Sequence, residues 1–90
     1  MEKKARRTSN RLAFAFVGNI RQPISERFGL AVRNRRKQLE MTHSDLAKLA
    51  GLSRPYISEV ECGRESISLE RAERLAKALN TNLPALLRED

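Results

Sequence analysis

The sequence contains very few of the residues that form disulfides, metal sites and aromatic pockets. Its 90 residues include one cysteine, one histidine, one tyrosine, three phenylalanines and no tryptophan. The single cysteine, Cys62, cannot form an internal disulfide, which is typical of proteins in reducing compartments. Together with the single histidine, His43, it cannot supply the four ligands of an ordinary zinc site. We therefore expect a cytoplasmic protein without a metal or other cofactor.

Long hydrophobic runs and catalytic combinations of side chains are also missing from the sequence. No stretch approaches the roughly 20 apolar residues that cross a bilayer, and the basic N-terminus lacks the apolar core of a secretory signal. No pair of carboxylates and no nucleophile with a neighbouring base stands out. These absences argue against a membrane protein and against an enzyme.

Positive charge is plentiful, and it is unevenly distributed along the chain. The sequence carries 18 Lys and Arg residues against 11 Asp and Glu residues, a net charge of +7. Residues 1–40 hold 11 basic and 3 acidic side chains, whereas residues 41–90 hold 7 basic and 8 acidic ones. One side of the molecule is therefore expected to meet a polyanion, with nucleic acid as the leading candidate and an anionic membrane surface as the weaker one.

Residues 1–25 are interpreted as a basic N-terminal arm that precedes a single domain over residues 26–90. Residues 1–11 are polar and cationic, and the apolar residues 12–17 end at the turn signal Gly18-Asn19. This apolar segment either packs on the first helix or extends a dimer contact. The cations of the arm either enter a minor groove or add only non-specific affinity as a solvated tail; they are Lys3, Lys4, Arg6, Arg7 and Arg11.

From residue 26 onward, apolar residues recur at helical spacing, which predicts an all-α domain of five helices. The first helix is expected over about residues 26–39, and the other four begin after residues suited to capping a helix, namely Thr42, Ser53, Ser68 and Asn82. Gly51 and Gly63 are expected to end the second and third helices. The residues expected on the buried faces include Val32, Leu39, Leu46, Leu49, Ala50, Ile57, Val60, Leu69, Ala72, Leu75 and Leu79.

The second and third helices, joined by residues 50–53, have the pattern of a helix-turn-helix. The turn needs a glycine, Gly51, because a side chain would obstruct the sharp change of direction. Apolar residues lock the two helices together and leave the outer face of the third helix polar. A helix held in this way can enter the major groove of DNA and present its N-terminal residues to base edges. The polar residues of this outer face are Arg54, Pro55, Ser58 and Glu59.

Residues 42–63, THSDLAKLAGLSRPYISEVECG, resemble the helix-turn-helix of the Xre/Cro family of phage and bacterial repressors. The resemblance covers roughly residues 27–88, and within the family the sequence around Tyr56-Ile57-Ser58 is most similar to restriction–modification controller proteins. The family implies a five-helix, lambda-repressor-like domain that binds operator DNA as a two-fold dimer and usually represses transcription. It also implies a bacterial or phage-encoded, nucleoid-associated protein.

The resemblance assigns roles to individual residues of this sequence. Arg54, Pro55, Ser58 and Glu59 occupy base-reading positions. Arg36 and Glu61 match an ion pair that joins the first helix to the end of the third. The positions that approach phosphates are Thr42, His43, Tyr56, Arg64 and Ser66.

Several of these roles have an alternative. Arg54 either donates two hydrogen bonds to guanine or contacts a phosphate, and Glu59 either accepts from cytosine or orients Arg54. Tyr56 either places its hydroxyl at a phosphate or covers the edge of the core.

Three residues depart from the family pattern. His43 stands where glutamine is usual, so its contact with phosphate is expected to be weaker or sensitive to pH. Pro55 has no donor to offer a base, and Cys62 replaces a frequent asparagine.

Two functions from different classes fit the sequence. The first is a sequence-specific transcriptional regulator that acts as a homodimer on double-stranded DNA. The second is an adapter, such as an antitoxin or a coactivator, whose main partner is a protein that residues 12–17 would bind.

Overall fold

The computed structural model describes residues 23–88, and all the regular structure in this range is helical. The helices are α2 (Ile24–Gln38), α3 (His43–Ala50), α4 (Arg54–Glu61), α5 (Leu69–Ala78) and α6 (Leu83–Leu87). The predicted all-α fold of five helices is confirmed, although α2 begins directly after Pro23, two residues before the expected start. No helix in the described range is long and apolar enough to span a bilayer. The predictions for the cations of the arm and for residues 12–17 lie outside the described residues.

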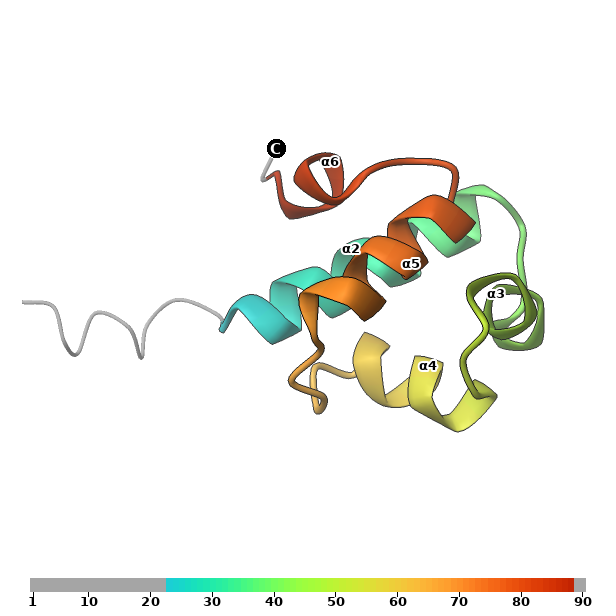
Figure 1. The fold of residues 1–90 in the computed structure, drawn as a ribbon, viewed down its shortest axis with the longest axis horizontal. Helices are drawn as coiled ribbons and strands as arrows, with labels where there is room; N and C mark the ends of the chain where they lie inside the picture. The colour runs from blue at the N-terminus through green and yellow to red at the C-terminus, as the bar shows by residue number, and fades with distance from the viewer. Residues whose placement is uncertain (1–22, 89–90) are drawn as a thin grey trace, which may run out of the picture.

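The helices pack around α2 and α5 (Figure 1). In this view α5 crosses in front of α2, with α3 and α4 on one side of the pair and α6 on the other. Contacts between α2 and α4, between α3 and both α4 and α5, and between α6 and both α2 and α5 close the domain. The helix-turn-helix formed by α3 and α4 therefore lies on one side of α2 and α5, and α6 lies on the other.

The core is a single cluster to which every helix contributes. The side chains of Val32, Leu46, Ile57, Leu75 and Leu79 are completely buried in it. Burying a side chain of this size stabilises the fold by about 1.5–3 kcal/mol relative to leaving it in water. The remaining buried apolar residues are Phe28, Ala47, Ala50, Val60, Ala72, Ala76 and Leu86.

Local side-chain hydrogen bonds begin four of the five helices, at the residues predicted to cap them. The hydroxyl of Thr42 accepts from the Asp45 amide at 3.0 Å, and the Asp45 carboxylate accepts from the Thr42 amide at 3.0 Å. The side chains of Ser53, Ser68 and Asn82 likewise accept from the backbone three residues ahead. These contacts satisfy amides that have no partner inside the helix.

Three leucines that were predicted to be buried are instead exposed. Leu49 in α3 is 63% exposed because the buried face of this short helix is formed by Leu46, Ala47 and Ala50. Leu69 is 78% exposed because it is the first residue of α5, a turn before Ala72 enters the core. Leu39 follows the last turn of α2 and is also exposed. The prediction was wrong because helical spacing identifies a face but not how far the neighbouring helices cover it.

Gly29 allows α2 to approach the end of α4 more closely than any residue with a side chain would. A Cβ atom at this position would overlap the carbonyl oxygen of Val60 and lie 3.0 Å from that of Glu61. Both neighbouring atoms belong to the backbone, so they cannot move aside as a flexible side chain would. The position of α4 therefore depends on glycine at residue 29.

We expect Gly29→Ala to lower the free energy of unfolding by about 3 kcal/mol, measured by urea denaturation, because overpacking outweighs the better helix propensity of alanine. Gly51→Ala is the matched control: the space around it is open, and its φ of 71° makes left-handed strain the main effect. That strain costs about 1–2 kcal/mol. If Gly29→Ala were as stable as the original protein, the proposed close contact of α2 with α4 would be wrong.

Candidate nucleic-acid interface

The helix-turn-helix is built by α3, a tight turn and α4. Gly51 ends α3 in the left-handed conformation at φ 71°, which glycine adopts without strain. Leu46 and Ala50 of α3 are buried together with Ile57 and Val60 of α4, and Leu52 of the turn is half-buried against them. The predicted locking of the two helices is therefore present in the structure.

The opposite face of α4 carries the four residues predicted to read bases. Arg54 and Pro55 in the first turn are exposed, while Ser58 and Glu59 one turn later are half-buried. Pro55 begins the helix without breaking a hydrogen bond, because amides of the first turn have no partner inside the helix. The N-terminal half of α4 is thus the part of the helix that DNA can approach most freely.

Glu59 is paired with Arg64, which lies in the segment after α4. Nη1 of Arg64 is 3.4 Å from Oε2 of Glu59, and both side chains are substantially exposed. Glu59 therefore interacts with Arg64, and in the described part of the chain it makes no hydrogen bond with Arg54. An exposed pair of this kind contributes little to stability, but it places a cation beside the carboxylate that faces the interface.

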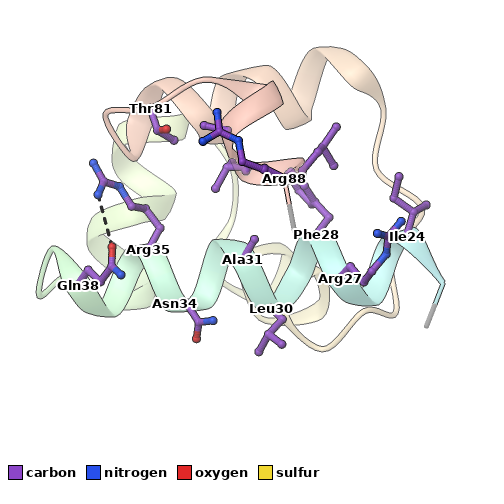
Figure 2. A pocket seen from close by; sticks show the side chains of 13 residues that line it. Ile24, Arg27, Phe28, Leu30, Ala31, Asn34, Arg35, Gln38, Thr81 and Arg88 are labelled. Atoms are coloured by element: carbon purple, nitrogen blue, oxygen red, sulfur yellow. Dashed lines mark hydrogen bonds between the residues drawn. The ribbon is translucent and has the colours of Figure 1, made fainter. Parts of the chain in front are cut away.

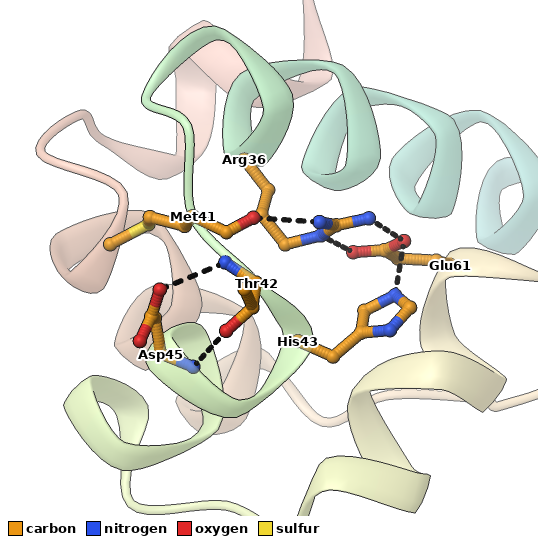
Figure 3. Close-up of polar contacts among 6 residues, drawn as sticks. All are labelled: Arg36, Met41, Thr42, His43, Asp45 and Glu61. Atoms are coloured by element: carbon orange, nitrogen blue, oxygen red, sulfur yellow. Dashed lines mark hydrogen bonds and ion pairs between the residues drawn. The ribbon is translucent and has the colours of Figure 1, made fainter.

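A buried carboxylate joins the other end of α4 to α2 and α3 (Figure 3). Glu61 accepts from Nε of Arg36 at 2.6 Å and from Nη2 of Arg36 at 3.0 Å. Nη1 of Arg36 also donates to the carbonyl of Met41 at 2.8 Å. Nε2 of His43 lies 3.0 Å from Oε1 of Glu61. Figure 3 draws this contact as a dashed line. The ion pair between Arg36 and Glu61 that the family resemblance implied is therefore one part of a larger network.

The network keeps Glu61 ionised although its side chain is only 5% exposed. Burial alone would raise the pKa of Glu61, but hydrogen bonds from Arg36 and His43 outweigh that effect and hold the pKa below its usual value. The same contact with Glu61 raises the pKa of Arg36. Removing one partner from such a pair strands a buried charge, which costs about 3–5 kcal/mol.

The residues predicted to contact phosphates fall into two groups. Thr42 and His43, at the start of α3, border a hollow that Ser44 and Arg54 also line. Arg64 and Ser66 are exposed in the segment that follows α4. Ser44 was not singled out in the sequence, although it also lines this hollow near the start of a capped helix.

Tyr56 packs at the edge of the core, against α5. Its ring is stacked beneath the guanidinium of Arg71, 5.2 Å from the ring centroid, and its hydroxyl oxygen is buried. This placement favours the interpretation in which Tyr56 covers the edge of the core over the one in which it reaches a phosphate. Arg71, in α5, was not singled out by the sequence because it lies 15 residues away from Tyr56 along the chain.

The structure contains no candidate metal centre within residues 23–88, where no three His, Cys, Asp or Glu side chains gather closely enough to hold an ion. Cys62 is exposed at the C-terminal end of α4.

Glu61→Gln should reduce stability near neutral pH by about 3 kcal/mol, because Arg36 would lose its ionised partner. Folding lowers the pKa of Glu61, so the ionised carboxylate contributes fully to stability at pH values above its pKa in the unfolded chain. This contribution disappears as the pH falls through the lower pKa that Glu61 has in the folded protein. The difference between variant and original should therefore shrink below about pH 4, as measured by urea unfolding across pH. Glu73→Gln, at an exposed site, is the control and should change stability by less than about 0.5 kcal/mol. If the stability difference between Glu61→Gln and the original protein stayed constant down to about pH 2, the ionised Glu61 carboxylate would not be the group that stabilises the fold.

Comparisons with known proteins agree with this geometry. The helix-turn-helix family model matches residues 32–86. The ImmF control region 10 kDa protein of Bacillus phage phi105 is 31% identical over 61 residues, which cover 68% of each chain. Control protein C.SmaI of Serratia marcescens is 41% identical over 56 residues, covering 62% of this chain and 67% of that protein.

The structure is also similar to that of the restriction–modification controller protein C.AhdI from Aeromonas hydrophila. The two share 34% sequence identity and superpose with a TM-score of 0.67, over 69% of this chain and 94% of that one. The family match spans more than half of the sequence and includes every element of the interface described above. This chain belongs to the Xre-like helix-turn-helix family of DNA-binding regulators.

Proposed function

We propose that this protein is a cytoplasmic, sequence-specific regulator of transcription that binds operator DNA as a homodimer and usually represses, without a catalytic step. The observation that carries the proposal is the division of α4 into two faces. Ile57 and Val60 are buried against the rest of the domain, while Arg54 and Pro55 project from the N-terminal end. A rigidly mounted helix with a free, polar N-terminal face is what major-groove readout requires.

Arg54 is proposed to supply the main base contact. Its guanidinium can donate two hydrogen bonds to O6 and N7 of one guanine, which discriminates against other bases by about 1–3 kcal/mol. Ser58 and Glu59 lie one turn further along the same face and would contact the neighbouring pairs. Because Arg64 is already paired with Glu59, the carboxylate is partly neutralised before it meets the negative potential of DNA.

Contacts with the DNA backbone would hold α4 in register. The amides and side chains at the start of α3, with Thr42, His43 and Ser44, form one anchor, and Arg64 with Ser66 forms the other. The positive end of the helix favours a phosphate at the first anchor. Such contacts position the protein without reading sequence. The basic residues of the N-terminal arm would add to this affinity or enter an adjacent minor groove.

A dimer is proposed because one recognition helix reads too few base pairs for useful selectivity. Two copies related by a two-fold axis would place their recognition helices about 34 Å apart, one turn of DNA. Between α2 and α6 lies a groove of about 640 Å³ (Figure 2), on the side of the domain away from α4. Leu87 and Ile24, which line the groove, are exposed, whereas Leu86 is buried in the core. This surface can therefore bind a second copy while α4 stays free.

The proposal is tested by selecting duplexes that the protein retains from a random pool and then titrating the enriched sequence beside a scrambled one at physiological salt. We expect a palindromic site bound at least about a thousandfold more tightly than the scrambled duplex. No enrichment, or equal and salt-sensitive affinity for both duplexes, would contradict sequence-specific regulation. It would favour the adapter function instead.

Arg54→Ala should abolish discrimination at one base pair in each half-site, with a loss of about 1–3 kcal/mol per half-site on the selected duplex. The readout is a titration against duplexes that carry each base at that position. Lys77→Ala removes the same charge from an exposed position on α5 and should retain the full sequence preference. If Arg54→Ala bound every duplex more weakly by the same factor, Arg54 would contact a phosphate and not a base.

A further inference from the structure

His43 occupies a position in which one of its ring nitrogens is committed to the protein. Nε2 lies 3.0 Å from Oε1 of Glu61, and the ring is one-third exposed. The Glu61 carboxylate is held by Arg36 as well, so it stays ionised and can only accept hydrogen bonds. Nε2 must therefore carry the hydrogen, and the neutral ring is fixed as a single tautomer.

The other ring nitrogen, Nδ1, is consequently a bare acceptor whenever the ring is neutral. Within residues 23–88, Nδ1 makes no hydrogen bond, and it is not completely buried. An acceptor repels the oxygens of a phosphate, whereas the N–H of an imidazolium donates to them. Protonation of Nδ1 thus converts His43 from a residue that repels phosphate into one that binds it.

Charged groups from two helices face the imidazole. Glu61 of α4 lies against the ring, and Arg36 of α2 and Arg54 of α4 line the same hollow. Asp45 on α3 itself is occupied by the Thr42 amide. A phosphate arriving in the hollow would add a negative charge beside the ring, and a negative charge favours the imidazolium.

We propose that His43 couples DNA binding to the uptake of a proton: because Glu61 fixes the neutral ring with its hydrogen on Nε2, His43 donates to a DNA phosphate only when Nδ1 is protonated. This inference rests on the proposed function, and it assigns His43 a regulatory role in it. DNA affinity rises as the pH falls, because only the imidazolium donates from Nδ1 to a phosphate. The coupling changes affinity by at most about tenfold per pH unit for each protomer bound, because one proton is taken up per ring.

The test is a titration of the selected duplex at pH 6, 7 and 8 and constant ionic strength, comparing the original protein with His43→Gln. Glutamine presents an N–H at every pH, so the variant should bind with nearly constant affinity and should exceed the original protein at pH 8. The original protein should lose affinity by at least about threefold over this range. Pro84→Ala, at an exposed residue of α6, controls for mutation as such and should keep the full pH dependence.

A second measurement examines the tautomer without DNA. His43 is the only histidine, so its ring nitrogens give an unambiguous NMR signal. Nitrogen-15 shifts of the free protein at pH 8 should show hydrogen on Nε2, and Glu61→Gln should relax that preference.

The outcomes separate the inference from the proposed function. Specific binding with the same pH dependence in His43→Gln, or hydrogen on Nδ1 in the free protein, would overturn the inference and leave the proposed regulator intact. Absence of specific binding at every pH would overturn the proposed function itself.

Discussion

One buried carboxylate, that of Glu61, determines how α4, the proposed recognition helix, is held. It is the last residue of α4, and it receives hydrogen bonds from Arg36 of α2 and His43 of α3. Through Arg36 it is also linked to the carbonyl of Met41 in the loop between those helices. Because a buried charge without partners is costly, the three helices can move relative to one another only by breaking this network. Gly29 adds a steric constraint at the same place by bringing the backbone of α2 against Val60 and Glu61.

The two ends of α4 have different surroundings because of this constraint. Its C-terminal end is fixed by ionic hydrogen bonds and close backbone packing, while its N-terminal end carries Arg54 and Pro55 into solvent. Base readout requires donors held within a fraction of an ångström, which side chains achieve best on a rigid element. The His43 ring lies between the two ends, in contact with the anchor at Glu61 and at the edge of the hollow beside Arg54. We therefore expect a change in the charge of that ring to alter DNA binding.

Local chemistry was predictable from the sequence, and long-range geometry was not. The capping residues Thr42, Ser53, Ser68 and Asn82 act on amides three positions away, so their role is visible in a short window. The exposure of Leu49 and Leu69 depends on where other helices end, which spacing alone does not encode. The pair of Arg36 and Glu61 was available only through the family resemblance, and the addition of His43 to it required the structure, because 18 residues separate His43 from Glu61.

A double-mutant cycle in urea unfolding at neutral pH tests most directly whether this network holds the recognition helix. The four proteins are the original, Arg36→Met, Glu61→Met and the double variant. The account predicts that each single change strands a buried charge and that the double variant loses less stability than the sum of the two, with an interaction energy of about 2–3 kcal/mol. Losses that add to within about 0.5 kcal/mol would show that the two residues act independently, and would contradict the account.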